Sequence, residues 1–396
     1  MGRIREITGY LVRQTDMLLW SLCSAATLYG ILLILSATHT VYRGSLKYVI
    51  VQGAGWCIGT AAYFLLSGID IVELSKKWRW ILGFNIGLIL LLLTPLGLVR
   101  NGNRAWLGVN TIGAKLGIEA LKNFPITFQP AEIVKITFIL LLAYQLVHLS
   151  ETRDLKRFTN VIQPTVHVVF MFCFYYVISH DAGSGLVYLF IFVCMAFAAG
   201  FAARWLVLGI GGAAVGLVAA WKLRLLRGDW YDRIMVVLDH SYQPQKAGWQ
   251  QTRGMIALGS GGLTGQGLFH GTQTQSPYRA SLPERQTDYI FCVCGEELGF
   301  LGCLAVISIL LAIVIRCFAV ARDANTRLES LVCVGMAGML IFQTVANIGM
   351  CLFILPVVGL TLPFFSYGGS SIVTLYAAMG IVSGIKKRSR PEWLMN

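Results

Sequence analysis

Residues 282–300 read LPERQTDYIFCVCGEELGF, and in this stretch a polar, charged loop gives way to a long apolar helix. Asp288 stands at the start of that helix, where Asp is favoured as an N-cap or first-turn residue. Glu296 and Glu297 follow roughly 12 to 14 Å deeper, at a rise of ~1.5 Å per residue. An ionisable side chain at mid-bilayer costs about 2.5–3.5 kcal/mol on insertion scales, which makes such residues functional candidates. The stretch therefore predicts a carboxylate-bearing helix at a membrane surface, with helix capping as the alternative role for Asp288.

The composition is that of a membrane protein with many spans. Of 396 residues, 56% are hydrophobic and only 13% are charged, whereas a soluble chain carries about 25% charged residues. None of the ten cysteines lies in a long polar loop, which predicts free thiols used as small apolar residues. The net charge of +13 suits anionic lipid or a pyrophosphate-bearing substrate, and no basic-aromatic stripe points to nucleic acid.

Ten apolar runs are long enough to cross a hydrocarbon core of ~30 Å. They lie at residues 17–37, 48–69, 78–98, 131–149, 162–180, 184–200, 203–221, 288–316, 329–354 and 366–386. We therefore expect a single all-α membrane domain over residues 1–396, with about ten transmembrane helices.

Lys and Arg are concentrated in alternate short loops, and this bias predicts that both termini face the cytoplasm. The short loops of the other side carry only Arg43 and Lys47. Two long loops, residues 99–130 and 222–287, then fall outside the cell membrane. A site built on that face would meet extracytoplasmic substrates.

Several polar residues stand where spans begin, and each has a structural and a functional interpretation. Glu132 and Lys135 share a helical face; they form an ion pair, or Lys135 meets a substrate phosphate while Glu132 orients it. Asp181 caps the sixth span or belongs to a site. Arg104 and Trp106 anchor the chain at the headgroup layer or take part in binding.

Three further patterns mark places where the backbone is unusual or a span is polar. Gln343 and Asn347 share a face of the ninth span, where amides typically join helices. Residues 355–371, LPVVGLTLPFFSYGGSS, predict an irregular re-entrant segment, which is tolerated only where it is buried or lines a watery cavity. Residues 259–267, GSGGLTGQG, lack the GK[ST] of a P-loop, so we expect these glycines to let the backbone fold over a substrate or another loop.

Five motifs together resemble the signatures of the SEDS family (shape, elongation, division and sporulation), the group of RodA, FtsW and SpoVE. They are NGNRAWLGV…FQPAEIVK, the Asp181-x-Gly183 turn, GSGGLTGQG, LPERQTDYIF…GEELGF and residues 355–371, in order along nearly the whole chain. The chain departs from the usual pattern in three places: Ala131 stands in place of Ser, His180-Asp181-Ala182-Gly183-Ser184 in place of Pro-Asp-Leu-Gly-Thr, and Tyr289 in place of Phe.

The resemblance implies a glycosyltransferase that joins the disaccharide-pentapeptide units of lipid II, carried on undecaprenyl pyrophosphate, into glycan strands outside the cytoplasmic membrane. In the family the Asp of the Thr-Asp-Phe/Tyr motif is the catalytic residue, which is Asp288 here. Motif position also marks a set of expected substrate-binding or supporting residues. These are Arg104, Glu132, Lys135, Asp181, Arg285, Glu296, Ser366 and Gly368.

Glycosyl transfer to a hydroxyl needs one carboxylate as base, and pyrophosphate leaves readily when cations stabilise its charge. One base is therefore enough for an inverting displacement. The resemblance leaves room for a divalent cation, Mg²⁺ or Mn²⁺, held by supporting carboxylates, and implies no organic cofactor. It implies a class B penicillin-binding protein, a transpeptidase, as partner. A lipid II flippase and a catalytically silent scaffold are the rival functions, and the short C-terminal tail favours a RodA-like role.

Overall fold

The computed structural model describes residues 15–42, 44–100, 102–108, 127–223, 229–243, 245–246 and 248–389. Within these ranges eight helices are long and apolar enough to cross a membrane. They are α2 (Met17–His39), α3 (Lys47–Leu66), α8 (Pro130–Thr152), α9 (Phe158–Ser179), α11 (Ala203–Lys222), α14 (Ile290–Asp323), α15 (Arg327–Cys351) and α16 (Gly369–Arg388).

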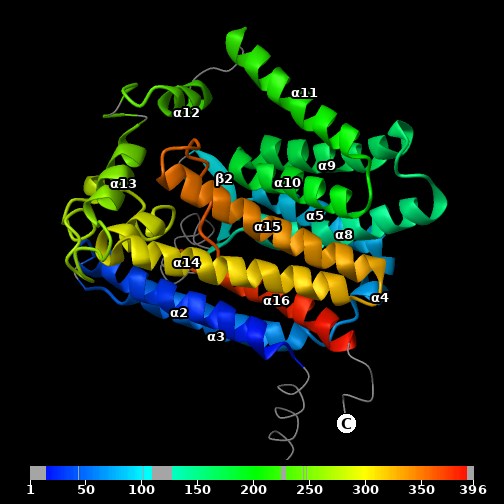
Figure 1. The fold of residues 1–396 in the computed structure, drawn as a ribbon, viewed down its shortest axis with the longest axis horizontal. Helices are drawn as coiled ribbons and strands as arrows, with labels where there is room; N and C mark the ends of the chain where they lie inside the picture. The colour runs from blue at the N-terminus through cyan, green and yellow to red at the C-terminus, as the bar shows by residue number, and fades with distance from the viewer. Residues whose placement is uncertain are drawn as a thin grey trace, which may run out of the picture.

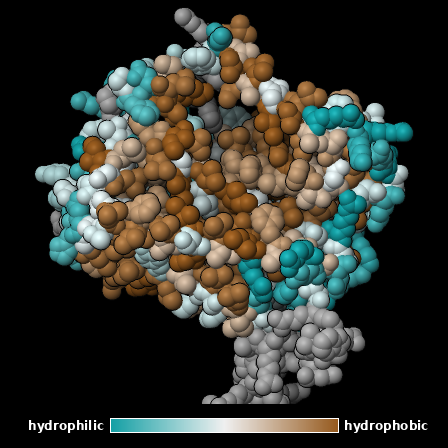
Figure 2. All heavy atoms as spheres, viewed as in Figure 1, coloured by the Kyte–Doolittle hydropathy of each residue, from teal (hydrophilic) through white to brown (hydrophobic). Residues whose placement is uncertain are grey.

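Two shorter apolar helices stand at the positions of the remaining two expected spans. They are α5 (Trp78–Leu90), which continues into the 3₁₀ turn η1 (Leu91–Leu93), and α10 (Ala182–Ala198). The mostly helical fold with many spans is thus as the sequence predicts. Figure 2 shows a broad hydrophobic middle on the face in view, with hydrophilic residues gathered toward its edges.

The helices form one bundle in which α14 and α15 run side by side through the middle (Figure 1). α2, α3 and α16 pack on one side of this pair, and α8 and α10 pack on the other. α11 differs from the rest, because it points away from the bundle and buries only Leu206 (Figure 1).

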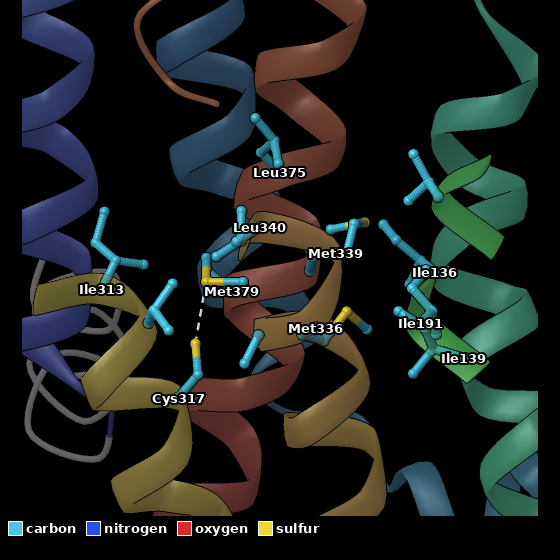
Figure 3. Close-up of a cluster of buried hydrophobic side chains, with 14 of the residues drawn as sticks. Ile136, Ile139, Ile191, Ile313, Cys317, Met336, Met339, Leu340, Leu375 and Met379 are labelled. Carbon is cyan, nitrogen blue, oxygen red and sulfur yellow. Dashed lines mark hydrogen bonds between the residues drawn. The ribbon is translucent and has the colours of Figure 1, made fainter. Parts of the chain in front are cut away.

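The core between these helices is filled by aliphatic and sulfur-containing side chains (Figure 3). Met336 and Leu340 of α15 lie near Met379 of α16, whose sulfur is 3.8 Å from the thiol of Cys317 on α14. All ten cysteines are free, as the sequence predicts.

The bundle has two ends with different roles. Near the start of α2 the backbone N–H of Asp16 donates to Ser383 Oγ of α16 at 2.8 Å, so the start of α2 and the end of α16 meet at one end, here called the far end. α14 begins at the opposite end, called the site end because it carries Asp288. A shared end agrees with an even number of spans; which side of a membrane each end faces stays a prediction.

The connections at the site end hold structure that the all-α expectation missed. β1 (Gly97–Arg100), β2 (Asn103–Gly108) and β3 (Thr127–Phe128) form a small antiparallel sheet in the order β1-β2-β3. α12 (Asp229–Leu238), α13 (Trp249–Ser260) and the 3₁₀ turn η2 (Arg279–Ser281) lie within the second long loop. The short helix α4 (Ile71–Lys76) connects α3 to α5 at the far end.

α14 is interrupted near its start, and the glycine-rich segment fills the interruption. The backbone of Gly299 has φ 67°, which breaks the helix. The carbonyls of Glu296 and Glu297 instead accept hydrogen bonds from the N–H groups of Gln266 and Gly267, each at 2.9 Å.

Only glycine fits this contact at Gly265. A Cβ there would lie 2.1 Å from the carbonyl oxygen of Glu297, and the φ of +83° is one that L side chains rarely adopt. The glycines were expected to let the backbone fold over a substrate or another loop, and in the structure they let it pack against a helix. Their partner is the broken first turns of α14.

Candidate functional site

Asp288 stands two residues before α14 and does not cap it. The N-cap is Tyr289, and no side chain accepts a hydrogen bond there. Within the described ranges the Asp288 carboxyl accepts no hydrogen bond and forms no ion pair, although the side chain is only partly exposed. The capping interpretation is therefore wrong for this residue, and its carboxyl is left available for chemistry.

The main chain of Asp288 is held firmly although its side chain is not. Asn347 of α15, fully buried, donates from Nδ2 to the carbonyl oxygen of Asp288 at 2.9 Å and to that of Leu360 at 2.7 Å. The thiol of Cys351 lies 3.7 Å from the same Asp288 oxygen. Sequence analysis assigned Asn347 only to helix–helix contact. In the structure it joins the loop that carries Asp288 to the re-entrant segment.

The re-entrant segment also donates hydrogen bonds to the loop that carries Asp288. Ser366 Oγ donates to the carbonyl of Thr287 at 2.6 Å, and the N–H of Tyr367 donates to the carbonyl of Gln286 at 2.9 Å. The N–H of Gly368 donates to Gln52 of α3 at 3.0 Å. Ser366 thus holds the backbone of the loop that carries Asp288, and Gly368 is tied to α3; their expected part in substrate binding stays a prediction.

The surroundings of Asp288 favour its protonated form. Burial, together with the negative charges of Glu284 and Asp181, raises the pKa of Asp288 to about 7. A general base works best when its pKa lies near the operating pH. The environment therefore gives this carboxyl the acid–base property that proton abstraction near neutral pH requires.

Asp181 is the helix cap that its position predicts, and it also faces the site. Its carboxylate accepts from the N–H and the hydroxyl of Ser184, at 3.2 and 2.8 Å, and from the Tyr175 hydroxyl at 3.2 Å. The re-entrant segment packs tightly on this turn, since a Cβ on Gly183 would lie 2.2 Å from the carbonyl oxygen of Val358.

Glu132 and Lys135 form a buried ion pair in the first turns of α8. Their charged atoms are 2.8 Å apart, and the Lys135 side chain is fully buried. Ser371 of α16 lies 3.4 Å from the second oxygen of Glu132. In the described part of the chain Glu132 is the only hydrogen-bond partner of the Lys135 ammonium, which has three donors.

Arg285 and Glu296 are both near Asp288 in sequence, yet their polar atoms are taken up by the loop. The Arg285 guanidinium donates to backbone carbonyls of Leu282, Thr274, Ser276 and Tyr278. Glu296 is fully buried and accepts from the N–H groups of Gln273 and Thr274 and from the Thr274 hydroxyl. This geometry favours a loop-positioning role for both residues over contact with a substrate.

Arg104 lies on β2, partly exposed, and makes no hydrogen bond or ion pair with any described residue. Among the expected site residues it is the cation that no described residue pairs.

The described residues offer a metal ion no ready set of ligands. No group of three or more His, Cys, Asp or Glu side chains comes together as a metal site within the described residues. Asp181 and Glu296, expected as supporting carboxylates, are instead occupied by hydrogen bonds from their own loops. We therefore assign no step to a metal ion.

A family model described as "Cell cycle protein", covering FtsW, RodA and SpoVE, matches residues 16–391 of the chain. The chain belongs to the SEDS family. Among its SEDS relatives, the peptidoglycan glycosyltransferase MrdB of Escherichia coli (strain K12) is 33% identical over 75% of both chains. Stage V sporulation protein E of Bacillus subtilis is 31% identical over 84% of this chain and 85% of its own.

Solved SEDS structures show the same fold. A chain from a structure titled "Structural coordination of polymerization and crosslinking by a peptidoglycan synthase complex" aligns with a TM-score of 0.76 and 26% identity, over 95% of this chain and 98% of its own. RodA of Thermus thermophilus aligns with a TM-score of 0.66 and 26% identity, over 95% and 98%.

Proposed function

We propose that this SEDS protein is a peptidoglycan glycosyltransferase that polymerises lipid II at the outer face of the cytoplasmic membrane. Its relatives include proteins named peptidoglycan glycosyltransferase MrdB and probable peptidoglycan glycosyltransferase FtsW. One observation carries the proposal beyond the names: Asp288 presents a carboxyl that no described residue occupies, on a backbone fixed from two sides.

In the proposed reaction Asp288 takes the proton of the acceptor hydroxyl as that oxygen attacks the anomeric carbon of the donor sugar. The bond from that carbon to the pyrophosphate oxygen breaks, and the configuration inverts. The leaving pyrophosphate carries away the bonding electron pair, and cations stabilise it. Arg104 and Lys135 are our assignments for that role, because Arg104 is unpaired among the described residues and Lys135 has unused donors.

Lys135 needs its neighbour in this scheme. Glu132 holds its ammonium in place in a buried setting, where an isolated charge is costly. A pyrophosphate arriving beside this pair would be attracted to Lys135 while Glu132 fixes the ammonium's position. Asp181 contributes negative charge that keeps the pKa of Asp288 high.

We infer that the protein acts with a class B penicillin-binding protein, a transpeptidase that cross-links the product. A structural relative was solved within a complex whose title joins polymerisation with cross-linking. The orientation that places the site end outside the cell rests on the distribution of Lys and Arg among the short loops.

The deciding experiment measures glycan polymer from labelled lipid II with purified wild-type protein and with Asp288→Asn, each with and without the partner. We expect polymer from the wild type and none from a folded Asp288→Asn. Lipid II transport across liposomes without any polymer would contradict the proposal and favour the flippase. Equal polymer from both proteins would keep the enzyme and refute Asp288 as its base. Polymerisation that requires added Mg²⁺ or Mn²⁺ would show that the substrate brings a metal to the site.

A further inference from the structure

A row of aromatic rings lies at the site end, outside the residues assigned to the chemistry. The ring centroids of Tyr42 and Tyr48 are 4.7 Å apart, and those of Tyr48 and Tyr367 are 4.9 Å apart. The three residues come from the α2–α3 connection, the first turn of α3 and the re-entrant segment. We call Tyr42, Tyr48 and Tyr367 the aromatic row.

An arginine stands at each end of the row. The guanidinium carbon of Arg279 lies 4.9 Å from the ring centroid of Tyr42. At the other end, burial raises the pKa of Tyr367 and the nearby Arg100 guanidinium opposes that rise. Arg100 also lies over the ring of Trp106 in β2, 5.8 Å from its centroid. The three rings of the row therefore lie between two cations, Arg100 beside the small sheet and Arg279 in η2.

The row is open to solvent and attached to the loop that carries the base. All three tyrosines are partly exposed, and both arginines are exposed. The N–H of Tyr367 donates to the carbonyl of Gln286 at 2.9 Å, two residues before Asp288. A ligand lying on the row would therefore end beside the catalytic-site loop.

This combination fits one kind of ligand. Aromatic faces bind apolar surface with specific geometry, and the C–H face of a sugar ring offers such a surface. Guanidinium groups bind carboxylates through paired hydrogen bonds, and the peptide stems of a glycan strand end in carboxylates. A pyrophosphate matches only the arginines. Tyrosines that merely anchor a protein at the headgroup layer need no contact with one another, whereas these rings pack in series.

We propose that the aromatic row, with Arg279 and Arg100, is the binding subsite for the growing glycan strand. Sugar rings lie on the tyrosines, and the carboxylates of the peptide stems pair with the arginines. The inference deepens the proposed function and rests on it, because it names the part of the surface that holds the growing strand while Asp288 acts.

The test measures binding of a soluble, uncross-linked glycan strand that carries peptide stems to the full-length protein in nanodiscs. The same strand with its stems removed by an amidase is the second probe. The variants are Tyr42→Leu and Arg279→Gln, and Tyr42→Phe is the version that keeps the ring. Tyr278→Leu is a matched control, because Tyr278 is 74% exposed beside Arg279 but outside the row. Arg253→Gln is the matched control for Arg279→Gln, because Arg253 also lies over an aromatic ring, that of Trp249, but outside the row.

Loss of one stacked ring or one paired cation is worth ~1 kcal/mol, or about fivefold in affinity. We expect Tyr42→Leu to weaken binding of both probes about fivefold and to shorten the strands made from lipid II. Arg279→Gln should weaken binding of only the strand that carries stems, and Tyr42→Phe and both controls should bind like the wild type.

Unchanged binding in both row variants would overturn the proposal. So would an equal loss in the two controls, or a change only in partition onto anionic vesicles, which would make the row a membrane anchor. The binding assay needs no turnover. The protein could therefore bind the strand through the row and yet fail to polymerise lipid II. That result would refute the proposed function and leave a glycan-binding site.

Discussion

Asp16 and Asp288 each precede a long helix, at opposite ends of the bundle, and their carboxyls are used in opposite ways. Asp16 is buried, caps α2 through the N–H of Leu19, and pairs with Arg316 at 2.7 Å. Asp288 does neither of these things among the described residues. The comparison teaches that a carboxylate at a helix start is structural when its lone pairs are occupied, and a candidate for chemistry when only its backbone is held.

The sharpest way to break this comparison is to make the same substitution at both positions. Asp288→Asn should lower the polymerisation rate by a factor of about 10² to 10⁴, the usual contribution of a general base, without lowering the melting temperature, because no hydrogen bond is lost. Asp16→Asn should keep the rate and cost ~1–3 kcal/mol of stability, since Arg316 loses its partner. Lipid II turnover and thermal unfolding measure the two effects, and similar profiles for both variants would contradict the distinction.

A second prediction tests whether the backbone of Asp288 must be held. Asn347→Leu removes the two hydrogen bonds that join the carbonyls of Asp288 and Leu360. A misplacement of about 1 Å can cost on the order of 10²-fold in rate, so we expect a loss of about 10- to 100-fold in kcat with little change in KM. Gln343→Leu, one turn earlier on the same helix, is the control. Its effect on kcat should be smaller, because Gln343 donates to no carbonyl of the described site loop.

The contact between the glycine-rich segment and α14 yields a third prediction. Gly265→Ala places a Cβ 2.1 Å from the Glu297 carbonyl, and we expect it to destabilise the folded protein by several kcal/mol, as overpacking does in other cores at ~1–3 kcal/mol or more. Gly259→Ala in α13 meets nothing within 4 Å and should be neutral or slightly stabilising. Thermal unfolding in detergent measures both, and equal melting temperatures would mean that the segment does not pack into the helix break.

The smallest expected effect concerns pH. Because the pKa of Asp288 is raised to about 7 by burial and by the charges of Glu284 and Asp181, kcat/KM should fall as the pH drops through about 7 and the base becomes protonated. Glu284→Gln removes a negative charge and so lowers the pKa of Asp288. The acidic limb of the pH profile, where kcat/KM falls, should move to lower pH, so that kcat/KM below pH 7 rises a few-fold over the wild type. Glu73→Gln on α4, at the far end of the bundle, should leave the limb in place, and an unmoved limb in Glu284→Gln would refute the electrostatic coupling.

Much of this organisation could be predicted from residue patterns, and the failures have a common cause. The spans follow from local hydrophobicity, so α2, α3, α8 and α9 begin within a few residues of where the apolar runs placed them. The small sheet was missed because its strands are short and lie in a loop whose pattern is not periodic.

Within the site, sequence position alone treated neighbouring polar residues alike. Arg285, three residues before Asp288, was grouped with the substrate contacts, yet its guanidinium donates to four loop carbonyls. Asn347 was expected to join two helices, yet its side chain donates to the carbonyl of Asp288, 59 positions earlier. Neither partner can be read from the sequence, because a hydrogen bond depends on the spatial arrangement of distant segments.

The sequence by itself determined that this chain is a membrane protein of many helices, with free thiols and a carboxylate at the start of one span, because hydrophobic length and motif order are local properties of the chain. The tertiary structure alone decided which of the acidic and basic side chains remain available. The Glu296 carboxylate is occupied because Gln273 and Thr274 of the second long loop donate to it. No described residue occupies the Asp288 carboxyl, because the re-entrant segment contacts only the backbone of its loop.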